Sequence, residues 1–296
     1  MSDTFENPDI ATTSPKDAVE TGIEADDMYR MSKLFVEHLC QLPLPVNVHR
    51  VLHGLLHRTC RDLPDWSPRA RQPEEGYRAR CVVLRKSLGL CGANGNRDLV
   101  AGVEAIRHLG FFQAIGFDHG NEWLVWRFHD DLLSAILDNA VYGLLDASAL
   151  CRLKRPTDYQ IFCLTSIVRR MRKPTFTFTV PDAAIWIDKE TIRWSDVGAG
   201  VIKALMLSCR HYGLTACVLL HRRGMLRGID TIEVRLRGPG SLWSMAVLAK
   251  LHPATEKCVL VDGSGRMDVN RGDFPELVRE LRSAKWRLSG LRRPEP

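Results

Sequence analysis

Three histidines on one predicted helix have a spacing that could support metal chemistry. His49, His53 and His57 recur every four residues, which places them on one face of a helix. A zinc peptidase needs His-Glu-x-x-His, but Gly54 occupies the position of the catalytic glutamate. We therefore interpret the three histidines as a solvated polar stripe rather than as a metal site.

Other residues that could take part in catalysis also lack the partner residues that a catalytic motif requires. His129-Asp130-Asp131 suggests metal-dependent phosphohydrolysis, but acids at a helix start beside the helix dipole explain it better. There is no G-x-x-x-x-G-K-[ST] loop for phosphates, no His-x-His pair for a nickase and no Asp-x-Asp for a primase. The sequence predicts no catalytic residue, no metal and no cofactor, so we do not expect an enzyme.

Cysteine usage and hydropathy bear on the compartment. The nine cysteines are scattered without a Cys-x-x-Cys pair, which favours reduced thiols in a cytosol-like compartment. No apolar run approaches the roughly 18–20 residues of a membrane span, and no signal peptide is visible. We expect a cytoplasmic protein with no membrane partner.

Charge divides the chain into an acidic tail and a basic body. Residues 1–30 hold eight acids against Lys16 and Arg30, a net charge of −6. Because the whole chain has a net charge of +6, residues 31–296 carry a net charge of +12. Residues 1–27 have low hydrophobicity and no periodicity, which predicts a flexible tail. Arginine clusters beside predicted turns favour a polyanion, and nucleic acid above all.

The body shows the same order of elements twice. Helices are expected over 28–40, from Asn47 to Cys60, over 78–90 and from Asp98 to Leu109, followed by a hairpin around Asp118-His119-Gly120-Asn121 and a helix from His129. In the second half, a helix capped by Thr157 or Asp158 precedes a strand at 175–180, a short helix, a helix capped by Ser195 or Asp196, and two strands. This order predicts an α+β fold with two tandem winged-helix modules.

The layout from Met28 to Arg237 resembles the plasmid and phage replication initiators that bind repeated origin sequences (iterons) through tandem winged helices. In the first half the resemblance rests on DLVAGVEAIRHLGFFQAIGF and EWLVWRFHDDLL, and in the second on VIKALMLSCRHYGLTACVLLHRRGMLRGIDTIEVRL. Residues 62–77 form a long insertion, and residues 238–296 extend beyond the usual second module.

The resemblance implies different roles for the two modules. A first module (28–145) would mediate homodimerisation and touch DNA secondarily, and a second module (146–237) would recognise the origin repeat. The host replicative helicase and its loader would be partners. Residues 238–296 are expected to form a hairpin (258–269) and a basic amphipathic helix (275–288) of unassigned role.

The residues expected to contact double-stranded DNA centre on the helix Val197–Tyr212. Its core stripe is Val197, Val201, Ala204, Leu205 and Ser208, which leaves Ala199, Lys203, Met206 and Arg210 on another face, with Ser195 at the N-terminal approach. Small residues would allow close approach, and long cations would reach phosphates or guanine edges.

Further cations could clamp the DNA backbone. These are Arg222, Arg223 and Arg227 in the predicted wing, and Arg169, Arg170, Arg172 and Lys173 at a helix end. Asn94, Asn96 and Arg97 open a helix of the first module, where a turn-and-cap role competes with phosphate contact.

The sequence also fits two other functions. A winged-helix transcription regulator would bind a palindromic operator as a dimer, whereas an initiator would bind direct repeats. A protein-docking module would show weak, salt-insensitive or absent DNA binding.

Overall fold

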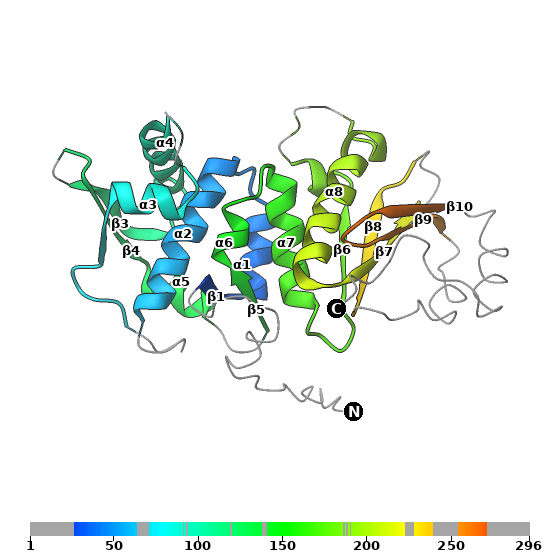
Figure 1. Cartoon of the computed structure of the whole chain (residues 1–296), viewed down its shortest axis with the longest axis horizontal. Helices are drawn as coiled ribbons and strands as arrows, with labels where there is room; N and C mark the ends of the chain where they lie inside the picture. Colours follow the sequence, from blue (N-terminus) through cyan, green and yellow to red (C-terminus); the bar gives the residue numbers. More distant parts are fainter. Residues whose placement is uncertain are drawn as a thin grey trace, which may run out of the picture.

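A computed structural model describes residues 27–63, 71–90, 92, 94–118, 120–137, 141–185, 187, 189, 191–222, 228–238 and 254–270. The molecule is elongated, with a sheet near each end and helices between them (Figure 1). Helix and strand are both abundant, which confirms the predicted α+β class.

The first half surrounds a three-stranded antiparallel sheet of order β2-β4-β3. A two-stranded antiparallel ribbon, in which Met28 pairs with Asp146, joins the start and the end of this half. Its elements are β1 (Met28–Ser32), α1 (Lys33–Cys40), α2 (Val46–Asp62), β2 (Tyr77–Arg80), α3 (Cys81–Ser87), α4 (Gly95–Arg107), β3 (Phe112–Asp118), β4 (Trp123–Phe128), α5 (Asp130–Ile136) and β5 (Tyr142–Asp146).

The second half surrounds a five-stranded antiparallel sheet of order β10-β9-β7-β8-β6. The hairpin predicted at 258–269 is present, and it extends this sheet through pairing between β9 and β7. The elements are α6 (Ala147–Leu150), α7 (Pro156–Val168), η3 (Asp182–Ala184) and α8 (Trp194–Tyr212), with the strands β6 (Thr175–Thr179), β7 (Thr215–His221), β8 (Thr231–Arg237), β9 (Thr255–Val261) and β10 (Arg266–Asn270).

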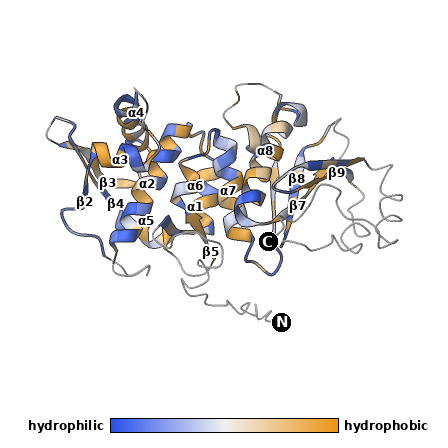
Figure 2. Ribbon diagram, in the orientation of Figure 1, coloured by the Kyte–Doolittle hydropathy of each residue, from blue (hydrophilic) through white to orange (hydrophobic). Residues whose placement is uncertain are grey.

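Helix α7 is the central packing element of the molecule. Eleven of its 13 residues are buried, as expected for a helix enclosed by neighbours on all sides. It packs against α1, β5 and α8, so it links the two halves. Figure 2 shows apolar residues gathered on the central helices, and one continuous hydrophobic core runs from Tyr29 to Val261.

Several element boundaries differ from the sequence predictions. The helix predicted over 28–40 is split, because Met28–Ser32 pairs with β5. Similarly, the helix predicted over 78–90 begins as β2, which pairs with β4. The predicted caps Asn47, Thr157, Asp158, Ser195 and Asp196 all lie inside the first turns of their helices. Residues 1–26 of the predicted tail (1–27) and the whole of the predicted helix 275–288 fall outside the described residues.

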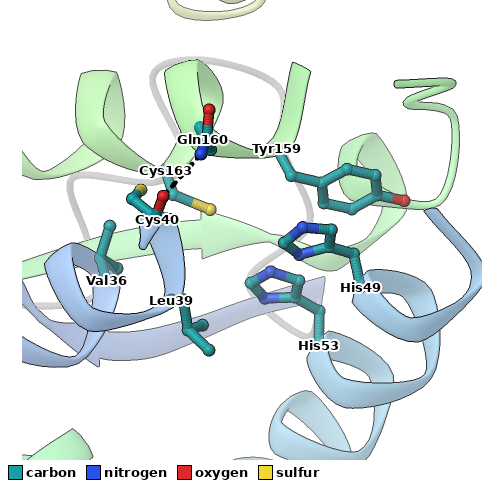
Figure 3. Close-up of a pocket in the computed structure, with 8 residues that line it drawn as sticks. All are labelled: Val36, Leu39, Cys40, His49, His53, Tyr159, Gln160 and Cys163. Carbon is teal, nitrogen blue, oxygen red and sulfur yellow. Dashed lines mark hydrogen bonds between the residues drawn. The ribbon is translucent and has the colours of Figure 1, made fainter. Parts of the chain in front are cut away.

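The interpretation of the histidine stripe as solvated is wrong for two of its three members. His49 and His53 are buried, with 3% and 2% of their surfaces exposed. Tyr159 of α7 stacks on His49 with ring centroids 4.6 Å apart (Figure 3). Tyr29 Oη lies 2.5 Å from His53 Nδ1. The remaining cavity measures about 10 Å³, which is room for one water at most. Helix packing across the two halves therefore removes these rings from solvent.

Candidate nucleic-acid interface

The candidate interface is built on α8, whose ends are fixed by local chemistry. The backbone N–H of Arg193 donates to Asp196 Oδ2 at 2.9 Å, and Lys189 Nζ lies 2.9 Å from Asp196 Oδ1. The hydrogen bond from Lys189, followed by that from the Arg193 backbone, lowers the pKa of Asp196. Gly213 ends the helix in a left-handed conformation with φ of 63°.

The predicted core stripe of this helix is confirmed. All five predicted positions are buried: Val197, Val201, Ala204, Leu205 and Ser208. The Ser208 hydroxyl is satisfied inside the helix because it donates to the Ala204 carbonyl at 3.0 Å.

The opposite side of α8 forms an exposed stripe, which we call the α8 face: Ser195, Ala199, Lys203, Leu207 and Arg210. Its members recur every three or four residues and therefore share one side of the helix. Leu207, which is 40% exposed, was missed by the sequence analysis, although it stands four residues after Lys203. Met206, the residue predicted in its place, is half-buried and packs against the core.

The C-terminal end of the α8 face abuts the β9–β10 turn. Arg210 Nε donates to the Gly263 carbonyl at 2.9 Å, and a Cβ on Gly263 would lie 2.8 Å from Arg210 Cα. Asp262 Oδ1 stiffens this turn by accepting from the backbone N–H groups of Ser264 and Gly265, each at 2.7 Å. The guanidinium of Arg210 is thus held in one direction by the backbone.

The other predicted cations have different surroundings. Arg222, at the base of the predicted wing, forms an ion pair with Glu256 at 2.6 Å, while Arg223 and Arg227 lie outside the described residues. The guanidinium of Arg169 stacks on the Tyr212 ring at 4.5 Å, and burial lowers its pKa. Arg169 is therefore committed to packing.

Arg170, Arg172 and Lys173 have exposed side chains at the α7–β6 connection. In the first half, Asn96 and Arg97 are exposed in the first turn of α4. Helices α4 and α8 lie on the two sides of the central helices α6 and α7, so Asn96 and Arg97 do not join the α8 face (Figure 1).

The first sheet carries an aromatic and cationic cluster that the sequence analysis did not single out as a site. The Arg78 and Arg80 guanidinium carbons lie 4.3 Å and 5.2 Å from the centre of the Trp123 ring. Arg78 also pairs with Asp118 at 3.2 Å. The strand register brings these side chains together, because Arg80 pairs with Trp123 across β2 and β4.

The described residues contain no cluster of three or more His, Cys, Asp or Glu side chains that could hold a metal ion. No helix among those ranges is long and apolar enough to cross a membrane.

Comparison with known proteins gives a match at the level of structure. No family model and no curated protein matches the chain. The crystal structure of Pi initiator protein in complex with iteron DNA matches with a TM-score of 0.50 and 14% sequence identity, covering 73% of this chain and 99% of that one. The two proteins therefore share a fold.

Proposed function

We propose that this protein is a sequence-specific binder of double-stranded DNA that initiates plasmid-type replication at origin repeats. The observation that carries the proposal is the fold shared with an initiator solved on iteron DNA. It is supported by the α8 face, which presents small, apolar and cationic side chains in one stripe. The work done is binding and positioning, with no bond made or broken.

The proposed architecture is two winged-helix modules. In each half, a helix, a strand, two helical segments and two strands follow in order: α2, β2, α3, α4, β3 and β4, then α7, β6, η3, α8, β7 and β8. The sheet orders β2-β4-β3 and β6-β8-β7 correspond, with the last strand of each set in the middle. In such a module the helix before the hairpin enters the major groove, which assigns that role to α8.

Each type of side chain on the α8 face has a use in a groove. Ser195 and Ala199 are small enough for the helix to approach base edges closely, and Leu207 offers an apolar surface to a thymine methyl group. Lys203 reaches a phosphate or a guanine edge as a flexible point charge. Arg210 is pre-oriented by Gly263, so less side-chain entropy is lost on contact.

Exposed cations outside α8 would position the modules on the duplex. Arg170, Arg172, Lys173 and the predicted wing are assigned to phosphates of the second module's site, and Asn96 and Arg97 to those of the first. Homodimerisation and contacts with the replicative helicase and its loader belong to the same proposal.

The test is a gel-shift titration of Lys203→Ala against duplexes with direct repeats. Loss of a phosphate contact should reduce the slope of log affinity against log salt by about one, while loss of a base contact should cost about 1–3 kcal/mol at one position of the repeat. Lys33→Ala is the matched control, because Lys33 lies on α1 and pairs with Glu37 at 3.5 Å. Equal affinity and salt slope for Lys203→Ala, Lys33→Ala and the unaltered protein would remove α8 from the interface.

A further inference from the structure

A basic hollow of about 60 Å³ runs along one side of α2, away from the α8 face. Arg50, Arg58 and Arg61 contribute to one wall, and Ser87 and Cys151 contribute to the other. The arginines recur at helical spacing, so they line the same side of α2. We call this site the α2 hollow.

The charge of the α2 hollow is strongly unbalanced. Among its lining residues in the described part of the chain, none is acidic. Asp62, which is not a lining residue, has its carboxylate 3.9 Å from Arg58 Nε and 3.4 Å from Arg61 Nε. One carboxylate is thus shared between two guanidinium groups, and the hollow retains a net positive charge.

The walls of the hollow are held in place before any ligand binds. Arg50 Nη2 donates to the Leu153 carbonyl at 3.0 Å, and the Cys151 thiol donates to the Ser87 carbonyl at 2.8 Å. Arg58 Nε is buried, and because the Asp62 carboxylate at 3.9 Å is beyond hydrogen-bond distance, this atom donates to no acceptor among the described residues. A buried donor without an acceptor is costly, so an anion that accepts its hydrogen bond is favoured.

We infer that the α2 hollow binds a phosphoryl group. Arginine presents a planar fork of donors that matches the oxygens of a phosphate, and several guanidinium groups together compensate its charge. The volume is far below the roughly 300 Å³ at which small-molecule pockets begin, so only a compact anion or one phosphate of a larger chain fits. A free phosphate ion and a phosphate of the DNA backbone share this chemistry.

The first test compares thermal unfolding of the full chain in inorganic phosphate and in chloride at equal ionic strength. Phosphate should raise the Tm by about 2–4 °C over chloride. Arg61→Gln should remove this rise, and it should leave the fold intact because the Arg61 side chain is 47% exposed. Arg107→Gln is the matched control, since Arg107 lies on α4 and pairs with Glu104, and it should keep the rise. In calorimetric titration, Arg58→Gln should weaken phosphate binding about tenfold or more.

The second test separates the two sources of phosphate. If duplex DNA displaces inorganic phosphate and Arg61→Gln also weakens duplex binding, the DNA backbone supplies the group. If phosphate protects the protein and the duplex neither competes nor responds to Arg61→Gln, the ligand is the free ion. Equal Tm in phosphate and chloride, or a rise that survives in both Arg58→Gln and Arg61→Gln, would overturn the inference.

Discussion

Burial of His49 makes the stability of this protein depend on pH in a way that one substitution should reveal. The ring stacks on Tyr159 at 4.6 Å and on His53 at 5.8 Å, and these two rings also stack on each other at 5.7 Å. His49 Nδ1 has no hydrogen-bond partner among the described residues. Burial lowers the pKa of His49 from its usual 6.5 to about 3. The His49 ring is therefore neutral in the folded protein at pH values where the same ring is protonated in the unfolded chain.

The sign and size of the effect follow from linkage. Stability from the neutral ring is fully present above pH 6.5 and is lost as pH falls towards about 3, because protons bind the unfolded chain preferentially. Each pH unit within that window costs up to about 1.4 kcal/mol, so lowering the pH from 6.5 to 4.5 should cost about 2–3 kcal/mol through His49.

The assay is urea unfolding at several pH values between 6.5 and 4.5, for the unaltered protein and His49→Phe. Phenylalanine keeps a flat ring against Tyr159 but takes no proton, so the variant should lose about 2–3 kcal/mol less over this range. His108→Phe, which replaces an exposed histidine at the end of α4, should leave the pH dependence of the unaltered protein in place. Identical pH dependence in His49→Phe and the unaltered protein would refute the reasoning.

Two further predictions concern the packing of the first half. Gly95→Ala should destabilise the fold by about 1–3 kcal/mol in urea unfolding, since its Cβ would lie 1.9 Å from the Leu90 carbonyl oxygen. Gly110→Ser is the comparison variant, because a Cβ there meets nothing within 4 Å while φ is 70°. Any destabilisation of Gly110→Ser therefore comes from backbone strain and not from crowding. Thr59→Val should cost about 1–3 kcal/mol, because the buried Trp126 indole N–H donates to the Thr59 hydroxyl at 3.0 Å. Unchanged unfolding midpoints would contradict either assignment.

Local pattern was sufficient to predict the elements whose hydrophobic periodicity is strong. The α8 core stripe, the hairpin β3–β4 and the hairpin β9–β10 follow from residue spacing and turn chemistry alone. Strands β1 and β2 could not be predicted in this way, because β1 is specified by pairing with the distant strand β5 and β2 by pairing with β4. Such pairing leaves no signature within a short window of sequence.

The candidate site shows the same division. Helical periodicity places Lys203 and Arg210 on one face, but the backbone contact from Arg210 to Gly263 and the stacking of Arg169 on Tyr212 depend on tertiary packing. The burial of His49 is likewise decided by Tyr159 on another helix. Sequence therefore identified which residues could act, and the fold decided which of them are available.

DNase footprinting of the purified full chain on DNA flanking its own gene tests the central proposal most directly. Regularly spaced protection over direct repeats is the predicted result, and Lys203→Ala should weaken it where Lys33→Ala does not. A single protected palindrome would contradict the initiator proposal in favour of a dimeric regulator. Absence of protection at low salt would contradict DNA binding itself.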